Sequence, residues 1–485
     1  MLDGPLKPVY RDVLLLIDGE WTAAADGQTL PVHNPATGET IGQVARAGRA
    51  ELERVVASAQ RGFNVWRKTS ALKRAQVLNA AAALLRERIP DIAVQMTLEQ
   101  GKVLAEARGE LDRAAETLEW AAGETQRLYG RVIPPRTGNV LQIVTQEPVG
   151  VVAAFSPWNF PVNQLARKAA AALAAGCAII AKGPEETPGS CAEFVRALED
   201  AGLPKGVFNL VFGVPAEISE FLIPHPAVRK VSFTGSTPVG KHLAAMAGQH
   251  MKRVTMELGG HAPVLVFSDA DLNIAAKTSV MSKLRNAGQT CVSPTRFLVE
   301  RTANEAFTEK FVKAFGSLRV GDGLDPTTQM GPLANARRVE AMERLVADAV
   351  QRGAKLRTGG ERIGNTGHFF QPTVLTDVPT DAAVMNEEPF GPVAIINAFD
   401  AFDDAIAEAN RLPFGLAAYA FTSSSRTAGR IAAQLESGML GINHFGLGNP
   451  EAPFGGVKDS GYGSEGGPEA IEAYVQPRFV TQADL

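Results

Sequence analysis

Cys291 is the residue of this sequence best suited to nucleophilic chemistry. It follows Gly288-Gln-Thr290 and precedes Ser293-Pro294, which are small, structure-breaking residues that leave backbone N–H groups free beside the sulfur. A reactive cysteine needs a polar, partly open site of this kind so that the thiolate can form and be reached. The other cysteines, Cys177 and Cys191, lie in apolar or helical runs, which predicts that they are buried in packing. A loop cysteine without a role would be the simpler explanation if Cys291 were the only signal.

Asn159 and Glu257 each follow a short apolar run, where a side chain can face a cleft. Asn159 lies in the turn Ser156-Pro-Trp-Asn-Phe-Pro161, which its two prolines make rigid. Its amide could donate a hydrogen bond to a developing oxyanion, or it could simply cap the turn. Glu257 ends the run that starts at Lys252 and stands beside two glycines. It is either an edge residue or a general base whose pKa a dry pocket would raise.

Polar residues after two other apolar runs could bind a nucleotide. Lys182 and Glu185 follow an apolar run, and they could hold the hydroxyls of a ribose or form a solvated pair on a loop. Gly235 and Ser236 form a glycine turn that opens a helix, and the free N–H groups and dipole of a helix start favour a phosphate. The spacing around Gly235 is not the G-x-G-x-x-G fingerprint, so this signal is weak by itself. Polar features at successive strand ends, together with a distinctive cysteine, nevertheless indicate a binding cleft.

Short apolar runs alternate with helix-like segments through the middle of the chain. The runs are Val149–Phe155, Ala178–Lys182, Val207–Val211 and Lys230–Phe233, and the segments after them are Val162–Gly176, Gly189–Gly202, Ala216–Ile223 and Thr237–Ala247. This alternation predicts a parallel sheet covered on both faces, with a ligand at the carboxyl ends of its strands. A second alternation, from Val264 to Asn443, predicts a second α/β domain. Earlier in the chain, Ala50–Tyr129 has helical spacing and Arg131–Thr145 is typical of two short strands around a turn.

Size and composition narrow the class of protein. A chain of 485 residues should divide into two or three domains, and 45% hydrophobic with 21% charged residues is typical of a soluble globular protein. A net charge of −4 argues against partners such as nucleic acid or an anionic membrane. Three cysteines cannot form a secreted disulfide framework, and the N-terminal run Val13–Ile17 is too short for a signal-peptide core or to span a bilayer. We therefore expect a cytoplasmic protein without a metal site.

Several motifs together resemble the aldehyde dehydrogenase superfamily, and the resemblance covers nearly the whole chain. They are Ile17-Asp-Gly-Glu-Trp21, Asn34-Pro-Ala-Thr-Gly-Glu39, Pro157-Trp-Asn-Phe-Pro161, Phe233-Thr-Gly-Ser-Thr237, Met256-Glu-Leu-Gly-Gly260, Gly288-Gln-Thr-Cys291, Glu387-Glu-Pro-Phe-Gly-Pro392 and Pro453-Phe-Gly-Gly-Val-Lys458. The resemblance implies an α/β protein with a Rossmann-like cofactor domain, an α/β catalytic domain and a small β oligomerisation element. The cofactor domain, which binds NAD, would take 1–128 and 147–257, the catalytic domain 258–447, and the oligomerisation element 129–146 and 468–485.

The resemblance also implies a role for each residue of the reacting centre. Cys291 matches the nucleophile that attacks the aldehyde carbon to give a thiohemiacetal. Asn159 and the backbone N–H of Cys291 match the oxyanion hole. Hydride transfer to the nicotinamide leaves a thioester, and Glu257 matches the base that activates water to release the carboxylic acid. Lys168 matches a family lysine near that base, with a role in proton relay.

A nicotinamide dinucleotide is the cofactor that this resemblance implies. Its expected contacts are Phe155, Ser156, Pro157, Trp158, Lys182, Glu185, Phe233, Gly235, Ser236, Val239, Leu258, Glu388 and Phe390. A carboxylate at Glu185 can accept hydrogen bonds from ribose hydroxyls but would repel a 2′-phosphate, so we expect NAD rather than NADP. The family usually has a proline directly after the lysine, whereas Gly183-Pro184 follows Lys182 here, which alters the expected loop.

Within the family, the chain looks most like the succinate-semialdehyde dehydrogenase branch. Arg167 and Arg285 match arginines that clamp the distal carboxylate in that branch, and Asn449 stands where a serine often contacts the substrate. A guanidinium fork suits a carboxylate, although two surface arginines would be the simpler explanation. We therefore expect a semialdehyde substrate such as succinate semialdehyde. The alternatives are an aromatic or longer aldehyde, because the loop His444–Pro450 is unusual, and a CoA-acylating reaction.

Two further expectations follow from the same resemblance. Ser293 replaces a second cysteine that some members use for a disulfide switch, so we expect no such switch here. The hairpin near Arg131–Thr145 and the tail Glu472–Thr481 resemble the element in which strands of two subunits pair. An exposed strand edge left unpaired is a liability, so a homodimer or homotetramer is expected.

Overall fold

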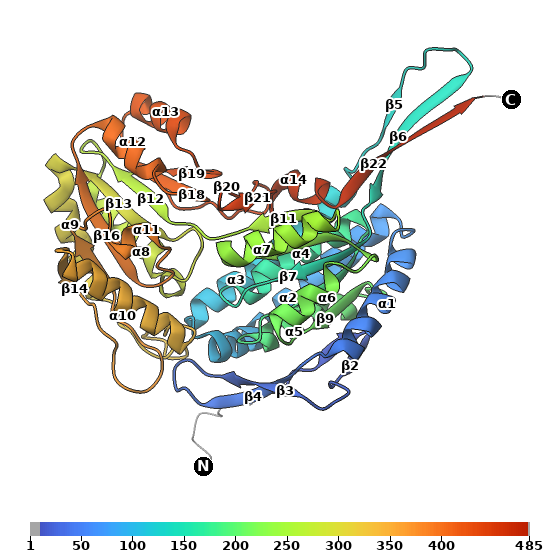
Figure 1. The fold of residues 1–485 in the computed structure, drawn as a ribbon, viewed down its shortest axis with the longest axis horizontal. Helices are drawn as coiled ribbons and strands as arrows, with labels where there is room; N and C mark the ends of the chain where they lie inside the picture. The colour runs from blue at the N-terminus through green and yellow to red at the C-terminus, as the bar shows by residue number, and fades with distance from the viewer. Residues whose placement is uncertain (1–9, 484–485) are drawn as a thin grey trace.

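Residues 10–483 are described by the computed structural model of this chain, in which two α/β lobes lie beside each other and a β arm projects from the first (Figure 1). The first lobe contains an eight-stranded sheet with the order β2-β1-β9-β8-β7-β10-β11-β21. Its parallel strands are β7 (Val151–Phe155), β8 (Ala178–Lys182), β9 (Phe208–Val211), β10 (Val228–Thr234) and β11 (Arg253–Glu257), and its antiparallel strands are β1 (Leu15–Ile17), β2 (Glu20–Thr22) and β21 (Gly461–Tyr462). All residues of β7, β8 and β9 are buried, as expected for a sheet covered on both faces.

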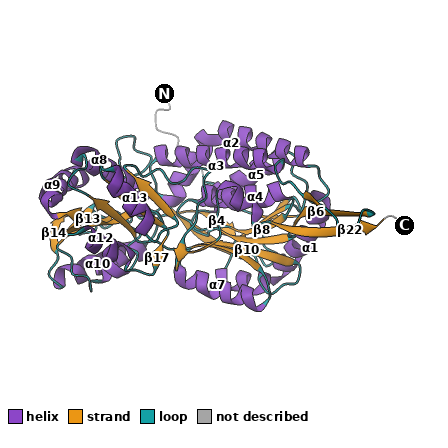
Figure 2. Ribbon diagram, turned by 90° about the horizontal axis from the view of Figure 1, so that it is seen from above, coloured by secondary structure: helices purple, strands orange, loops and turns teal. Residues whose placement is uncertain are grey.

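The strand order of this sheet reverses between β7 and β10, because β8 and β9 lie on one side of β7 and β11 lies beyond β10 on the other. The connecting helices are α4 (Pro161–Ala175), α5 (Pro188–Asp200), α6 (Pro215–Leu222) and α7 (Thr237–Gln249). Figure 2 shows α4 and α5 over one face of the sheet and α7 over the other. The predicted alternation is thus confirmed, and ligands of such sheets bind at the strand ends beside the reversal.

The predicted helical region forms α1 (Arg49–Trp66), α2 (Ala71–Gln100) and α3 (Leu104–Thr125). Helix α2 ends at Gly101, whose φ of 94° lies in the left-handed region that glycine tolerates, and the chain turns there into α3. Helix α4 starts with Pro161, a residue suited to the first helical turn, and nearly all its side chains are buried. The alanines between Ala169 and Ala175 are small enough for α4 to lie between the sheet and α3, so its polar residues face the interior.

The second lobe contains a seven-stranded sheet with the order β14-β15-β16-β13-β12-β18-β19, in which only β14 is antiparallel to its neighbour. The strands are β12 (Ala262–Val266), β13 (Pro294–Glu300), β14 (Lys355–Thr358), β15 (Thr373–Thr376), β16 (Val393–Phe399), β18 (Ala417–Phe421) and β19 (Met439–Ile442). Its helices are α8 (Leu272–Leu284), the 3₁₀ turn η1 (Arg285–Gly288), α9 (Arg301–Gly316), α10 (Ala336–Gln351), α11 (Ala383–Asn386), α12 (Phe402–Asn410) and α13 (Ser425–Gln434). The second α/β unit is therefore confirmed.

The arm consists of β5 (Arg131–Ile133), β6 (Val140–Pro148) and β22 (Val475–Ala483), paired in the order β22-β6-β5 (Figure 1). The remaining short elements are the antiparallel pair β3 (Thr29–His33) and β4 (Thr40–Ala45), the pair β17 (Phe414–Gly415) and β20 (Val457–Lys458), and α14 (Gly467–Glu472). The two predicted strands between 131 and 145 are thus present, and the C-terminal tail joins them.

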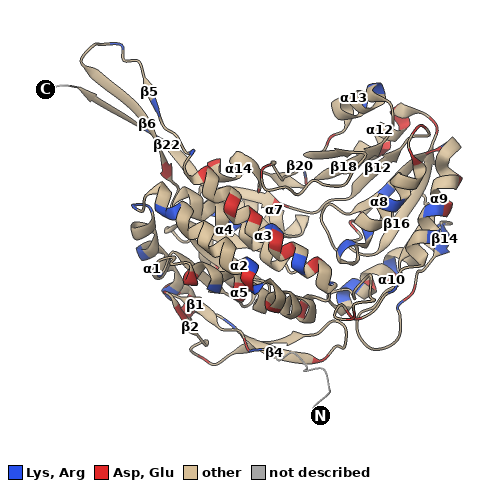
Figure 3. Ribbon diagram, turned by 180° about the vertical axis from the view of Figure 1, so that it is seen from behind, with Lys and Arg blue, Asp and Glu red and all other residues tan. Residues whose placement is uncertain are grey.

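Acidic and basic side chains are mixed along α2 and α3 rather than gathered by sign (Figure 3). Between residues 10 and 483, no helix is long and apolar enough to cross a membrane, and no group of histidine, cysteine and acidic side chains is arranged to hold a metal ion.

Candidate active site

Cys291 lies where two cavities of the structure meet. The larger is a groove of about 620 Å³ between the lobes, and Asn159 and Glu388 line it from opposite sides. The smaller, which we call the arginine cavity, has a volume of about 140 Å³ and is lined by Arg113, Arg167 and Arg285, among others. Cys291 contributes to the walls of both. Two different molecules, one in each cavity, could therefore approach the same sulfur.

The turn before Cys291 has an unusual backbone. Asn286 (φ 50°, ψ 37°) and Ala287 (φ 53°, ψ 33°) both adopt the left-handed conformation. For residues other than glycine this conformation costs roughly 1–2 kcal/mol each. A Cβ atom at Gly288 would lie 2.1 Å from the carbonyl oxygen of Gly391, so glycine is required there. Contacts around the turn must offset this strain, and in doing so they fix the position of the sulfur.

Asn159 joins the first lobe to the loop of Cys291. Its Nδ2 donates to the carbonyl oxygen of Gln289 (3.1 Å), and its own carbonyl oxygen accepts from Nδ2 of Asn286 (2.9 Å). The side chain is buried. An amide nitrogen has two N–H groups and only one is used here, so the other can donate to an oxygen that becomes negative beside Cys291.

Glu257 ends β11 with a buried carboxylate, and neither of its oxygens has a hydrogen-bond partner among the described residues. The pKa of Glu257 is raised to about 7, mainly by burial and next by the charge of Glu465, while Lys168 opposes both effects. A carboxyl group with a pKa near neutrality can exchange a proton with water at physiological pH. The environment of Glu257 is therefore that of a candidate general base.

The thiol of Cys291 differs from the expectation based on its loop. It is only partly exposed, and burial raises its pKa well above the usual range, with further upward contributions from the charges of Glu257 and Glu388. The polar loop predicted easier thiolate formation, but burial, together with two carboxylates from distant segments, outweighs the free N–H groups. The prediction for the other two cysteines is confirmed, because Cys177 and Cys191 are fully buried.

Lys168 forms a buried ion pair with Glu465, which the sequence interpretation missed. The Nζ atom of Lys168 also donates to Oγ1 of Thr234 (2.6 Å), and Glu465 accepts from the hydroxyl of Ser232 (3.2 Å). These side chains come from α4, from β10 and from the glycine-rich tail. The only sign of Glu465 in the sequence was that glycines flank it, in Gly463-Ser-Glu-Gly-Gly467. Glycines also follow Glu257, in Glu257-Leu-Gly-Gly260.

Glu388 and Phe390 form the second lobe's side of the groove. The carboxylate of Glu388 accepts from the backbone N–H of Gly260 (3.0 Å), and burial raises the pKa of Glu388 to about 7. Phe390 has a φ of 47° and meets the ring of Trp158 edge-on, with centroids 5.6 Å apart. Both residues follow α11, so the position of α11 determines where they lie.

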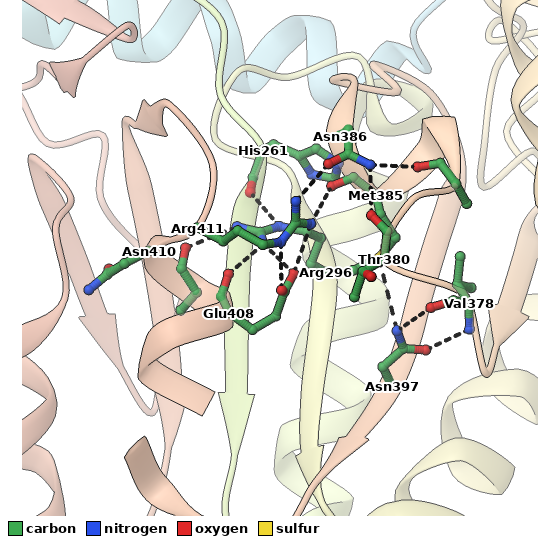
Figure 4. A network of polar contacts seen from close by, with 12 residues as sticks. His261, Arg296, Val378, Thr380, Met385, Asn386, Asn397, Glu408, Asn410 and Arg411 are labelled. Carbon is green, nitrogen blue, oxygen red and sulfur yellow. Dashed lines mark hydrogen bonds and ion pairs between the residues drawn. The ribbon is translucent and has the colours of Figure 1, made fainter. Parts of the chain in front are cut away.

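A polar network around Arg296 contacts α11 (Figure 4). The buried guanidinium of Arg296 donates through Nε to the carbonyl oxygen of His261 (3.2 Å) and pairs with Glu408 (3.0 Å). The His261 ring in turn contacts the carbonyl oxygen of Val384 in α11 (2.9 Å). The network thereby links the segment just after Glu257 to the helix just before Glu388.

The guanidinium groups of the arginine cavity differ in how firmly they are held. Arg167 is buried, donates to the carbonyl oxygens of Glu465 (2.7 Å) and Gly448 (3.0 Å), and lies 4.5 Å from the centre of the Phe454 ring. Arg285 lies 4.9 Å from the ring centre of Phe160, and its side chain has no hydrogen bond or ion pair with another described residue.

The third cation of this cavity, Arg113, comes from α3 and pairs with Glu116 (2.9 Å). It was not predicted, because the surface of α3 carries many charges and nothing in the sequence singles out this one. Asn449 lines the same cavity, together with Phe160, Phe445 and Phe454. No acidic side chain belongs to the described lining, so the cavity is cationic and partly aromatic.

Comparison with known proteins identifies the family to which this geometry belongs. The model of the aldehyde dehydrogenase family matches residues 21–480. The chain belongs to that family. A 4-(hydroxymethyl)benzenesulfonate dehydrogenase of Comamonas testosteroni is 50% identical over 97% of this chain and 98% of its own length. The succinate-semialdehyde dehydrogenase [NADP(+)] of Escherichia coli is 43% identical over 96% of each chain.

Solved aldehyde dehydrogenase structures have the same fold. The crystal structure of succinate-semialdehyde dehydrogenase from Burkholderia pseudomallei superimposes with a TM-score of 0.95 at 43% identity, and the match covers 97% of this chain and 98% of the other. The predicted aldehyde dehydrogenase fold and the likeness to the succinate-semialdehyde branch are confirmed. This aldehyde dehydrogenase is an oxidoreductase, and its family uses NAD or NADP.

The residues predicted to contact the dinucleotide fall into two groups. Those that line the groove are Pro157, Trp158, Gly235, Ser236, Leu258, Glu388 and Phe390. The others, Phe155, Ser156, Lys182, Glu185, Phe233 and Val239, lie outside its lining, at the ends of β7, β8 and β10 or in the first turn of α7. Lys182 and Glu185 form an ion pair (2.5 Å), and Val239 is 47% exposed. The structure therefore gathers the first group around Cys291 and spreads the second along the strand ends.

The groove of this aldehyde dehydrogenase fits a dinucleotide. Its volume lies in the range of roughly 300–1,000 Å³ that is typical of ligand sites. The hydroxyls of Ser156 and Thr187 lie near the strand ends outside this lining, and both are buried without a hydrogen-bond partner among residues 10–483. The helix α7 begins after Ser236 without a side-chain cap, which leaves its first N–H groups free for a phosphate.

Proposed function

We propose that this aldehyde dehydrogenase uses NAD to oxidise an aldehyde with a distal anionic group to the corresponding carboxylic acid. One observation carries the proposal: Cys291 is shared by a groove that suits a dinucleotide and by a cavity lined with arginines. The substrate carbonyl would lie at that shared point, with the anion in the arginine cavity. Succinate semialdehyde is the leading candidate, because its carboxylate is a few bonds from the aldehyde.

In the proposed reaction, the chain's own residues supply the nucleophile, stabilise the oxyanion and accept a proton. The thiol of Cys291 gives its proton to water, the thiolate attacks the aldehyde carbon, and the negative oxygen accepts hydrogen bonds from the amide of Asn159 and the N–H of Cys291. A dinucleotide bound in the groove would accept the hydride, which leaves the acyl group on the sulfur as a thioester. Glu257 then takes a proton from the water that attacks the thioester. The Lys168–Glu465 pair adjusts the pKa of Glu257 and supports a relay role for Lys168.

The chemistry of the arginine cavity also favours a second substrate candidate. A sulfonate is an anion that guanidinium groups bind as they bind a carboxylate, and the cavity walls include Phe160, Phe445 and Phe454. The Comamonas testosteroni relative is named for a benzenesulfonate compound. An aromatic aldehyde with a sulfonate therefore belongs beside succinate semialdehyde in any substrate panel.

Arg285→Ala is expected to raise KM for succinate semialdehyde by about 10- to 100-fold, because a charge-assisted hydrogen bond contributes roughly 1.5–3 kcal/mol. KM for propanal, which has no anion, should change less than about threefold if the variant only loses charge recognition. The measurement is NADH formation followed by absorbance for both aldehydes. Arg285 is a better choice than Arg167, whose guanidinium also holds the backbone at Gly448.

Two comparisons make this test specific. Arg301→Ala, which breaks an exposed pair with Asp400 outside both cavities, should leave KM for either aldehyde unchanged. The pair 4-formylbenzenesulfonate and benzaldehyde repeats the measurement with an aromatic substrate. Equal effects of Arg285→Ala on charged and neutral aldehydes would remove the anion site from the proposal, whereas a larger effect on the sulfonate would make it the better substrate class.

The preference for NAD is proposed from the charge at Glu185. Its carboxylate lies against Lys182 at the end of β8, where it can accept hydrogen bonds from a ribose but would repel a 2′-phosphate by roughly 1–4 kcal/mol. We expect kcat/KM for NAD to exceed that for NADP at least about fivefold, and Glu185→Gln to reduce this ratio. A preference of the unaltered protein for NADP, which the Escherichia coli relative's name indicates for that enzyme, would refute it.

The proposed assembly is a homodimer or homotetramer formed through the arm. The surface of the arm carries exposed apolar side chains, namely Val132 (70% exposed), Leu141 (52%) and Phe479 (55%). Its outer strands, β5 and β22, have free edges in the described chain, and a strand of a second copy could pair there. Light scattering that finds only monomer would count against this.

The division into domains also stays a proposal: 1–128 with 147–257, then 258–447, with 129–146 and 468–485 as the arm. It is supported by the change of sheet between β11 and β12. Strand β21 belongs to the first sheet, so the chain returns to the first lobe after 447. Residues 1–9 and 484–485 of these ranges lie outside the described part.

A further inference from the structure

A buried lysine contacts the main chain of Asn159 from the turn between α2 and α3. The side chain of Lys102 is fully buried, and its Nζ atom donates to the carbonyl oxygen of Asn159 (2.8 Å). The same ammonium group pairs with Glu110 of α3 and lies 4.1 Å from the ring centre of Phe160. A buried charge is expensive unless it is paired and hydrogen-bonded, so these contacts determine where Lys102 can lie.

Glu110 extends this contact to the helix that follows Asn159. One carboxylate oxygen faces Lys102, while the other accepts from the backbone N–H groups of Val162 (3.0 Å) and Asn163 (3.1 Å), in the first turn of α4. Helix starts leave such N–H groups without partners, and a carboxylate there also suits the helix dipole. Lys102 and Glu110 together therefore hold both ends of the short segment from Asn159 to α4.

The loop on the other side of the reacting centre is held by different residues of the same two helices. Glu106 accepts from the backbone N–H of Asn286 through both oxygens (3.1 and 3.0 Å), and Gln100 donates to the Asn286 side chain (2.9 Å). The loop of Cys291 therefore has its own supports. Loss of the Lys102–Glu110 pair would remove the support of Asn159 from the α2–α3 turn, whereas the supports of Asn286 and its bond to the carbonyl oxygen of Asn159 would remain.

We propose that Lys102 and Glu110 are positioning residues for the oxyanion donor. They fix the main chain of Asn159 so that its side-chain amide lies where the negative oxygen forms. An oxyanion hole acts only if its donors are already in place, and a displacement of about 1 Å can reduce the rate about 100-fold. The inference rests on the proposed oxyanion role of Asn159, and it assigns the placing of that donor to a charge pair outside both cavity walls.

The test replaces the pair in the intact protein by Lys102→Met with Glu110→Gln, which keeps the side-chain volumes and one acceptor for α4. We expect kcat with aldehyde to fall about 10- to 100-fold while KM changes less than about threefold. Alkylation of Cys291 by iodoacetamide should keep its rate within about twofold, since no oxyanion forms in that reaction. The matched control is Arg86→Met with Glu119→Gln, an exposed pair on the same helices, which should leave kcat unchanged.

An unchanged kcat would overturn the proposal, and so would a joint fall of kcat, alkylation rate and melting temperature, because that pattern indicates general loss of structure. If the double variant does not fold, Glu110→Gln alone should still lower kcat about three- to tenfold at constant alkylation rate, and an unaffected kcat would again overturn the proposal. The variant Asn159→Ala separates failure of the proposed oxyanion role of Asn159 from failure of the proposed positioning role of Lys102 and Glu110. If that variant keeps its full kcat, the oxyanion role itself fails, whereas a slow Asn159→Ala beside a normal double variant refutes only the positioning role.

Discussion

Replacement of Cys291 by serine is expected to abolish aldehyde oxidation, with kcat lower by at least about 10⁴-fold. A serine hydroxyl ionises far less readily than a thiol, and two buried carboxylates that bear on this sulfur, Glu257 and Glu388, have a pKa of about 7 and are weak bases. An ester on serine would also be hydrolysed more slowly than a thioester. The measurement is NADH formation with succinate semialdehyde under saturating cofactor.

Two controls show that the loss is chemical. Trp158 lines the groove against Phe390, so quenching of tryptophan fluorescence by NAD should persist in Cys291→Ser with an unchanged Kd. The matched variant Cys191→Ala removes a fully buried cysteine that lies outside both cavities, and it should retain activity with a small loss of thermal stability. Turnover that survived in Cys291→Ser would refute the proposed mechanism as a whole.

Much of the fold was predictable because local pattern and burial agree in this chain. The central strands β7 and β8 are continuous apolar runs up to their last residues, and α4 begins at Pro161 and is capped by Gly176. Boundaries were less predictable. The first run was expected to begin at Val149, but β7 begins at Val151, because the backbone N–H of Val149 bonds to Tyr474 in the tail and Gly150 has a φ of 133°.

The candidate site was only partly predictable, and the reason lies in tertiary packing. Asn159 and Glu257 follow apolar strands, so their positions at the cleft follow from the fold class. Glu465 reaches the same centre from the tail, and Arg113 reaches the arginine cavity from a helix rich in charges. The raised pKa of Cys291 depends on burial and on carboxylates that meet only in the folded chain. Local sequence could not reveal these convergences.

Glu257→Gln is expected to separate formation of the thioester from its hydrolysis. Without a base for water, the steady-state kcat should fall roughly 10²- to 10⁴-fold, while a rapid burst of about one NADH per active site remains. Stopped-flow absorbance measures both phases. Alkylation of Cys291 should not slow, because Glu257 raises the pKa of that thiol and its loss favours the thiolate. A slower alkylation, or a missing burst, would instead make Glu257 the base that activates the sulfur.

The pH dependence supplies the second half of this prediction. Since the pKa of Glu257 is about 7, the carboxylate is protonated below that pH and cannot accept a proton from water, so kcat should fall as the pH drops below about 7. Glu257→Gln should remove this fall of kcat at low pH, which is the acidic limb of the pH profile. Glu465→Gln should move this acidic limb to lower pH, because it deletes a negative charge that raises the pKa of Glu257, whereas Lys168 still lowers that pKa. A limb that stays in place in Glu257→Gln would assign it to another group, and a limb that moves upward in Glu465→Gln would contradict the electrostatic coupling between the tail and the base.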